Sequence, residues 1–301
     1  MNNPIVVGVD PTHEDREPLV FAARLAELTR APLVAVAGYP AHVIPTRIDT
    51  PEYNRLMRRG AEEALDRAAA ALPLQARTLA VGGQSAARAV HDALAELDAG
   101  LLVLGSAHRG ALGRVVVGSV ADRMLHGARC PVAVVPRGYE VPPVVRRIGV
   151  AFVDTPEGRS ALAAGAALAA RGGAALDVVT AVPPADWTGI APAPGNYPAD
   201  NALTREAAER TARAAVEELA GTADATVTAV GERTVDALVA RSEGWDLLVS
   251  GSRGYGPLRT VLLGSVSRSL SHAARCPLLV LPRAATPAFG SLLSGAAVAG
   301  A

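Results

Sequence analysis

The most constraining feature of the sequence is an internal repeat. Residues 101–137 align without a gap on residues 247–283 at a constant offset of 146, and 19 of the 37 aligned positions are identical. Chance does not produce such a match, so the chain is built from two copies of one unit. The period far exceeds that of a solenoid repeat, and 301 residues suffice for two domains of ordinary size, so each copy should be a whole domain.

The boundary between the copies is predicted from composition. The segment Gly138–Val145 contains the adjacent prolines Pro142 and Pro143, which favour an extended, rather stiff linker. We therefore predict a first domain over residues 1–141, a second domain over 142–285, and a flexible tail rich in Gly, Ala and Ser over 286–301.

Apolar runs typical of strands alternate with segments of helical spacing. The strand runs are continuously apolar, which is typical of parallel strands covered by helices on both faces. The predicted fold class is α/β, with two tandem open, doubly wound, parallel five-stranded sheets, which bind ligands beyond the carboxyl ends of their strands. In the first copy the sequence predicts strands at 5–9, 32–38, 77–83, 101–105 and 131–136, and helices at 16–29, at 52–72, from the N-cap Ser85 to Leu97, and after Ser119.

Composition argues against several functional classes. The 29 basic and 29 acidic residues balance, whereas a dedicated nucleic-acid binder needs a basic face. Cys130 and Cys276 are too few for a disulfide framework or a thiolate metal site, and each precedes Pro at the start of a strand, as expected of a small buried thiol. We expect neither a secretory signal nor a membrane span, and the default expectation is a soluble cytoplasmic protein.

A glycine pattern in the second copy points to phosphate binding. Gly251 and Gly254 follow a strand, and after nine further residues Gly264-Ser265 opens a helix. Glycine lets backbone N–H groups approach an anion, and a helix amino terminus offers free N–H donors. The first copy repeats the pattern at Gly105, Gly118 and Ser119, with His108 in place of the second glycine.

This pattern, Gly-x2-Gly-x9-Gly-Ser, resembles the nucleotide motif of the universal stress protein family. The resemblance covers roughly residues 4–137 and 146–283. It implies a Rossmann-like, adenine nucleotide α-hydrolase-like fold, ATP as the ligand with Mg²⁺ left open, and a role in stress or growth regulation through an unidentified protein partner. The ATP-binding residues that the resemblance and the strand ends together predict are Asp10, Ala37, Gly82, Gly105, His108, Gly118, Ser119, Val120, Ala181, Gly231, Gly251, Arg253, Gly254, Gly264, Ser265 and Val266.

The two copies depart from the family pattern at different places. The family places an Asp at the end of its first strand to contact the nucleoside, and Asp10 fits that position. In the second copy, counting back from Leu162, the equivalent of Leu19, puts Val153 opposite Asp10, and Asp154 lies one place later. The first copy therefore keeps the Asp and loses a glycine, whereas the second keeps the glycines and shifts the Asp by one place.

Two other functional readings stay open. One is a nucleotide-free, dimeric interaction module whose partner surfaces include the segments 39–51 and 183–201. The other is an enzyme on the same fold, either electron-transfer flavoprotein-like or nucleotide-hydrolysing. No general base, catalytic triad or metal set is visible, so we expect weak ATPase activity at most.

The last strand of each copy would lie at a sheet edge. A long apolar edge strand is prone to aggregation unless it is paired. We therefore predict that the two sheets pair through residues 132–135 and 278–281, which gives a pseudo-dimer within one chain. Whether whole chains also form a homodimer is left open by the sequence.

Overall fold

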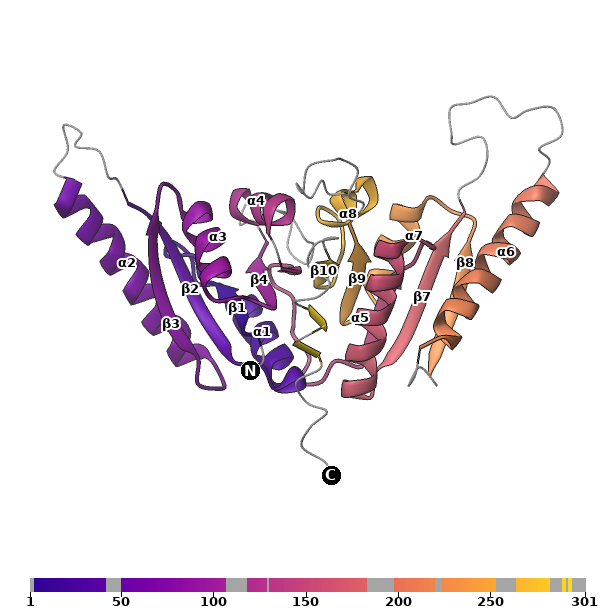
Figure 1. Cartoon of the computed structure of the whole chain (residues 1–301), viewed down its shortest axis with the longest axis horizontal. Coiled ribbons are helices and arrows are strands. Elements are labelled where there is room, and N and C mark those ends of the chain that lie inside the picture. Colours follow the sequence, from indigo (N-terminus) through magenta and orange to yellow (C-terminus); the bar gives the residue numbers. More distant parts are fainter. Residues whose placement is uncertain are drawn as a thin grey trace.

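The fold was analysed in a computed structural model that describes residues 3–41, 50–106, 118–128, 130–182, 198–219, 224–252, 264–281, 289–290 and 292–293. Each repeat forms an alternating α/β unit, and the two units lie side by side (Figure 1). The first unit contains β1 (Ile5–Gly8), α1 (Arg16–Thr29), β2 (Leu33–Pro40), α2 (Thr50–Ala71), β3 (Arg77–Gly83), α3 (Ala86–Glu96), β4 (Leu101–Gly105), α4 (Ser119–Gly127) and β5 (Val132–Val135). The second contains β6 (Arg147–Ala151), α5 (Pro156–Gly172), β7 (Ala175–Ala181), α6 (Pro198–Glu217), β8 (Ala225–Val230), α7 (Thr234–Ser242), β9 (Leu247–Gly251), α8 (Ser265–Leu270) and β10 (Leu278–Leu281).

The strands form one ten-stranded sheet in the order β3-β2-β1-β4-β5-β10-β9-β6-β7-β8. Pairing is parallel within each unit, as at Ile5 with Leu33 and Ile148 with Leu247. The units join through β5 and β10, which pair antiparallel with Ala133 opposite Leu279. The predicted pairing of residues 132–135 with 278–281 is confirmed, and it places both apolar edge strands inside the sheet.

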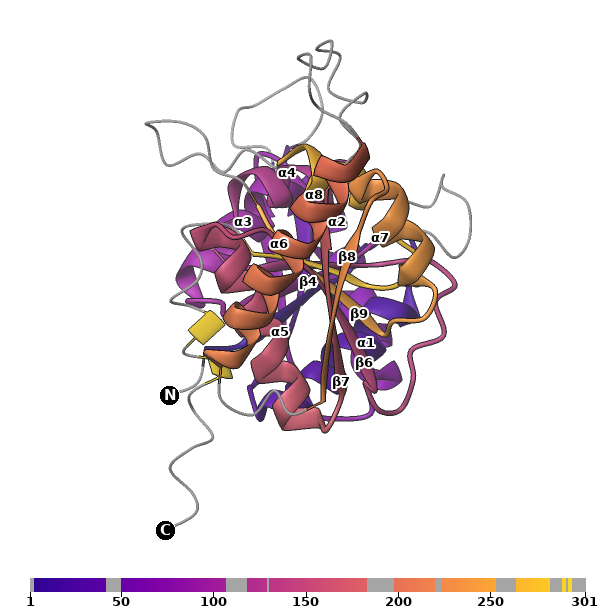
Figure 2. The ribbon, with the colours of Figure 1, turned by 90° about the vertical axis from the view of Figure 1, so that its right-hand side faces the viewer.

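Helices cover both faces of the sheet, as the view along the second unit shows (Figure 2). Phe21, Leu65 and Leu162 belong to the core on the face that carries α1, α2, α5 and α6. Val90, Met124 and Leu238 belong to the core on the opposite face, under α3, α4, α7 and α8. This double coverage explains why the strand runs are apolar without alternation.

Several predicted boundaries need correction. The strand β2 extends to Pro40, and α2 and α6 begin at Thr50 and Pro198. The segments 39–51 and 183–201, which the sequence offered as partner surfaces, therefore include parts of a strand and of two helices. Ser85 caps α3 as predicted, because its Oγ accepts a hydrogen bond from the Arg88 amide at 3.2 Å.

The linker between the units is tied to both of them. The Gly138 amide donates to Glu17 Oε1 of α1 at 2.7 Å, and the Tyr139 hydroxyl donates to the Asp246 carbonyl at 3.4 Å. The amides of Arg146 and Arg147 donate to Asp246 Oδ2 at 2.6 and 3.0 Å. Hydrogen bonds to both units, and not only the stiffness of the prolines, thus fix the path of this segment.

Part of the predicted flexible tail is docked. Phe289 and Leu292 are 2% and 0% exposed and belong to the core of the α1 face. Leu292 lies directly over Gly100, where an added Cβ would come within 2.6 Å of its Cδ1. For these residues the expectation of a flexible tail is corrected, since burial of apolar side chains holds them in place.

Among the described residues, no helix combines the length and the apolar character that a membrane crossing requires.

Candidate functional site

The strand order defines where ligands are expected in each unit. The order reverses between β1 and β4 in the first unit, and between β6 and β9 in the second. In open α/β sheets such switch points open a crevice beyond the carboxyl ends of the strands. The helices α4 and α8, which follow β4 and β9, lie at the same end of the molecule in both views (Figures 1 and 2). The candidate sites are therefore these two switch points.

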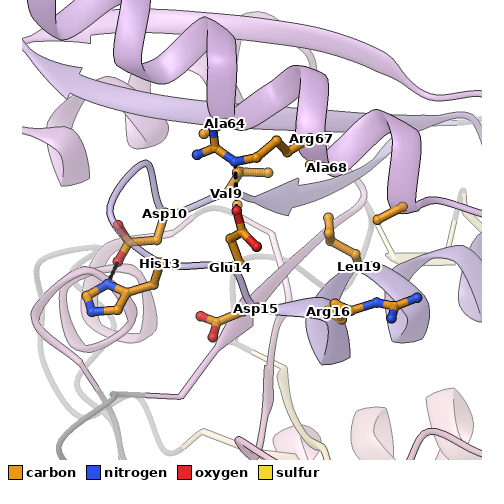
Figure 3. A pocket seen from close by; sticks show the side chains of 12 residues that line it. Val9, Asp10, His13, Glu14, Asp15, Arg16, Leu19, Ala64, Arg67 and Ala68 are labelled. Carbon is orange, nitrogen blue, oxygen red and sulfur yellow. Dashed lines mark hydrogen bonds and ion pairs between the residues drawn. The ribbon is translucent and has the colours of Figure 1, made fainter.

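Asp10 lies two residues beyond the end of β1, in the turn that leads to α1 (Figure 3). Its Oδ1 accepts hydrogen bonds from the amide of Thr12 at 2.8 Å and from the hydroxyl of Thr12 at 2.7 Å, while Oδ2 lies 3.4 Å from His13 Nδ1. Burial alone raises the pKa of Asp10, but these hydrogen bonds outweigh it and the pKa lies below its usual value. Asp10 is therefore an ionised turn residue, and its half-exposed carboxylate keeps acceptor capacity.

The second unit lacks this carboxylate, as the sequence comparison predicted. The amide of Val9 donates to Val36 O at 2.8 Å, and the amide of Phe152 donates to Val179 O at 2.9 Å. This shared pairing makes Phe152 the equivalent of Val9, so the residue after it, Val153, stands opposite Asp10. Asp154, one place later, pairs with Arg159 Nε at 2.6 Å.

The first glycine of the second motif is required by close packing, and that of the first motif is not. A Cβ added at Gly251 would lie 2.5 Å from the carbonyl oxygen of Glu157, in the first turn of α5. At Gly105 an added Cβ would lie 3.2 Å from Asp15 Oδ2. The absence of a side chain at Gly251 is thus explained by the helix that packs on the strand end, without any phosphate. In the first unit, moreover, a carboxylate lies beside the motif.

The second half of each motif opens a helix, as predicted. Gly118 and Gly264 are the N-cap residues of α4 and α8, and Ser119 and Ser265 are the first helical residues. The N–H groups of the first turn have no acceptor inside the helix, so they can donate to an anion. The next residues, Val120 and Val266, are half-buried and pack against the core under α3, α4, α7 and α8.

The two helix starts differ in charge. Asp122 lies in the first turn of α4, whereas the equivalent residue in α8 is Arg268. A negative charge near a helix amino terminus competes with a phosphate, and a positive charge attracts it. The helix that follows the second motif thus carries a positive charge where the helix that follows the first motif carries a negative one.

Three buried serines of the second unit were missed by the sequence analysis. The Ser267 hydroxyl donates to the carbonyl of Gly251 at 2.8 Å and lies 3.1 Å from Ser250 Oγ, so α8 is held against the end of β9. Ser252 is fully buried, and its hydroxyl has no hydrogen-bond partner among the described residues, which exclude 253–263 and 282–288. The first unit has Leu104 and Ala121 at the positions of Ser250 and Ser267. This replacement of two hydroxyl side chains by aliphatic ones was the available sequence signal.

The remaining predicted site residues lie on the neighbouring strands. Ala37 lies inside β2, not at its end, and its side chain is fully buried. Gly82 is exposed on β3, opposite Tyr39. Ala181 ends β7 as predicted, and Gly231 follows β8, where an added Cβ would lie 3.0 Å from Arg205 Nη1. His108, Arg253 and Gly254 lie outside the described residues.

Both cysteines are buried thiols, in agreement with the prediction. Burial raises the pKa of Cys130 to about 12, and burial followed by the charge of Asp246 raises that of Cys276. In the described part of the chain, no group of three or more His, Cys, Asp or Glu side chains is placed to hold a metal ion.

Comparison with known proteins assigns this architecture to a family. The sequence model of the universal stress protein family matches residues 1–136 and again residues 145–282. The chain belongs to the universal stress protein family. The tandem arrangement and the fold class predicted from the sequence are both confirmed.

Similar proteins include two of Mycobacterium tuberculosis. Universal stress protein Rv2005c is 34% identical over 193 residues, which is 61% of this chain and 62% of that relative, so the match spans under two thirds of its length. Universal stress protein Rv2623 is 27% identical over 294 residues, covering 92% of this chain and 95% of the relative. A crystal structure of a universal stress protein from Archaeoglobus fulgidus shares the fold with a TM-score of 0.64 at 19% identity, over 92% of this chain and 98% of that one.

Shorter family members have been crystallised with nucleotides. One of them, from Archaeoglobus fulgidus in complex with dAMP, is 27% identical to this chain. The match covers 43% of this chain and 94% of that chain, with a TM-score of 0.34.

Proposed function

We propose that this tandem universal stress protein binds an adenine nucleotide, ATP by preference, at the switch point of its second unit, and that the bound nucleotide regulates its association with a partner protein. The triphosphate would be held by the turn after β9 and by the first turn of α8. In this proposal Gly251, Arg253, Gly254, Gly264 and Ser265 provide the phosphate contacts, and Mg²⁺ accompanies the triphosphate as its counter-ion.

The observation that carries the proposal is the contact between α8 and the end of β9. The Ser267 hydroxyl donates to the carbonyl of Gly251, so the end of β9 lies next to the helix whose N-cap is Gly264. A triphosphate spans two such groups of N–H donors more readily than one. Arg268 adds a positive charge to the same short helix, three residues after Ser265.

We extend the proposal to the first unit, where the nucleoside contact and not the phosphate contact is the stronger one. Asp10 supplies an ionised carboxylate that can accept hydrogen bonds from ribose hydroxyls or from an adenine amino group. Asp15 and Asp122 oppose a triphosphate there. We therefore expect weaker nucleotide binding in this unit than in the second. No residue is assigned as a general base, and no hydrolytic step is proposed.

A second candidate function is a nucleotide-free interaction module. It is favoured by the packing reason for Gly251 and by the hydrogen bonds that already engage Asp10. Both features are complete without a ligand. A module of this kind would act through its surface, with the motif retained as structure.

The two candidates are separated by identifying the small molecules released when the purified protein is denatured, and by melting the protein in ATP. A ligand that binds only the folded state adds about 2.7 kcal/mol to the free energy of unfolding when its concentration is a hundred times its Kd. The melting temperature therefore rises with ligand concentration. Nucleotide in the extract, or a concentration-dependent rise, supports the nucleotide-binding function. An extract without nucleotide, combined with an unchanged melting temperature in ATP, would support the interaction module.

A further inference from the structure

The sheet ends in two strands that have a neighbour on one side only, β3 and β8. Figure 2 looks at the side of the molecule on which β8 lies, and the strand is visible there between α6 and α7. An edge strand presents a row of backbone N–H and C=O groups with which another strand can pair. Within the described part of the chain, β7 is the only strand that pairs with β8.

The hydrogen bonds of β8 show which of its backbone groups face the open edge. The amide of Val182 donates to the carbonyl of Val230 at 2.9 Å, so the backbone of Val230 is directed toward β7. Along an edge strand, residues that bond the neighbouring strand alternate with residues that do not. The residues of β8 whose N–H and C=O groups point outward are therefore Ala225, Val227 and Ala229.

The strand β8 carries none of the features that usually protect a sheet edge. Natural edge strands are blocked by charged side chains, by proline or by a bulge. The segment Ala225–Val230 contains no charged residue, no proline and no glycine, and its Thr and Val residues favour strands. The opposite edge differs, because β3 begins with the exposed Arg77 and ends with two glycines. Of the two edges, β8 is thus the one suited to pairing.

The outward groups of β8 are complementary to those of a second copy of the same strand. About a twofold axis through Val227, Ala225 of one chain lies opposite Ala229 of the other, so the outward N–H and C=O groups meet in antiparallel pairs. In the same register, Thr226 of one chain lies opposite Thr228 of the other. Thr pairs across antiparallel strands are stabilising, and both threonines are accessible in the single chain.

We propose that two copies of this chain associate through β8, antiparallel about a twofold axis, so that the sheet continues from one chain into the other. This arrangement repeats the one that already joins β5 to β10, where two apolar edge strands pair antiparallel. Charge on the neighbouring α6 does not oppose it, because Arg210 and Arg213 form ion pairs with Glu206 and Glu209. The proposal concerns assembly and does not depend on nucleotide binding.

Sedimentation velocity of the full chain between about 1 and 100 µM tests the proposal. A single strand pair buries less surface than a standard interface, so we expect weak association, with the mass rising from 30.7 kDa toward twice that value. Exchange of the outward amides of Ala225, Val227 and Ala229 should slow as the concentration rises. A mass that stays at one chain, or a dimer in which these amides exchange as fast as in the single chain, would overturn the proposal.

Variants at the two edges locate the contact. Thr226→Lys places a charge at an exposed position of β8 and should weaken association at least about tenfold. Ala229→Pro removes an N–H group that the pairing with β7 does not use, and should have the same effect. Thr78→Lys, at an exposed position of β3, is the matched control and should leave the mass unchanged. Association that persists in both β8 variants, or that Thr78→Lys weakens as much as Thr226→Lys does, would refute this interface.

Discussion

Ala133 and Leu279 lie directly opposite each other where β5 and β10 pair, and both side chains are fully buried. Each α/β unit has its own parallel sheet, and this contact joins the two sheets into one. Neither strand has a free edge in this arrangement, which removes the hazard that two apolar edge strands would otherwise create.

A charge at this junction should separate or destabilise the units. Ala133→Asp buries a carboxylate without a partner and should lower the free energy of unfolding by on the order of 3–5 kcal/mol, measured by urea denaturation. Val144→Asp, at a half-exposed linker position, is the matched control and should change little. Rapid amide exchange over residues 132–135 and 278–281 in the native wild type would contradict this account of the junction.

The buried hydroxyl of Ser267 should stabilise the end of β9. Ser267→Ala removes the hydrogen bond to the Gly251 carbonyl and the contact with Ser250 Oγ, and leaves that carbonyl with the longer hydrogen bond from Ser250 Oγ at 3.2 Å. The expected loss is about 0.5–1.5 kcal/mol of unfolding free energy. Ser160→Ala, whose half-exposed hydroxyl bonds the carbonyl four residues back, should cost less. An equal loss in the two variants would show that Ser267 has no special structural role.

The carboxylate of Asp10 should make stability depend on pH in one direction. Because the pKa of Asp10 is lowered on folding, its contribution is present above the unfolded value of 3.8 and is lost as the pH falls through the folded value. The stability difference between wild type and Asp10→Ala should therefore be constant at neutral pH and shrink below about pH 3.8, in urea denaturation over a pH series. Asp10→Asn keeps an acceptor for Thr12 and serves as the control. A difference that stays constant down to pH 2 would contradict the shifted pKa.

The charges on α4 and α8 should determine which unit binds ATP more tightly. Exchanging Arg268 for Asp should weaken ATP binding, and exchanging Asp122 for Arg should strengthen the weaker site, each by about two- to fivefold, because a charge at a helix terminus is worth about 0.3–1 kcal/mol. Calorimetry at low salt measures both. Unchanged ATP affinity in Arg268→Asp, combined with a clear change in Asp122→Arg, would show that the first unit holds the phosphates.

Local sequence patterns predicted the architecture well. The repeat, the Ser85 cap and the apolar strands 132–135 and 278–281 each follow from neighbouring residues and a general rule of sheet pairing. Contacts between distant residues could not be read in this way. Glu157 and Gly251 are far apart in the chain, so the packing reason for the glycine appeared only in three dimensions, and the same holds for the hydrogen bond from Ser267 to Gly251.

The most direct test of the central claim is calorimetric titration of ATP into wild type, Gly264→Val and Ser265→Ala, with Gly127→Ala, where an added Cβ contacts nothing, as the control. Each site variant removes a close backbone approach or a hydroxyl donor to phosphate, so the account predicts about ten- to a hundredfold weaker binding, since a hydrogen bond to a charged group is worth about 1.5–3 kcal/mol. Equal affinity in all four proteins would contradict a phosphate site at the start of α8.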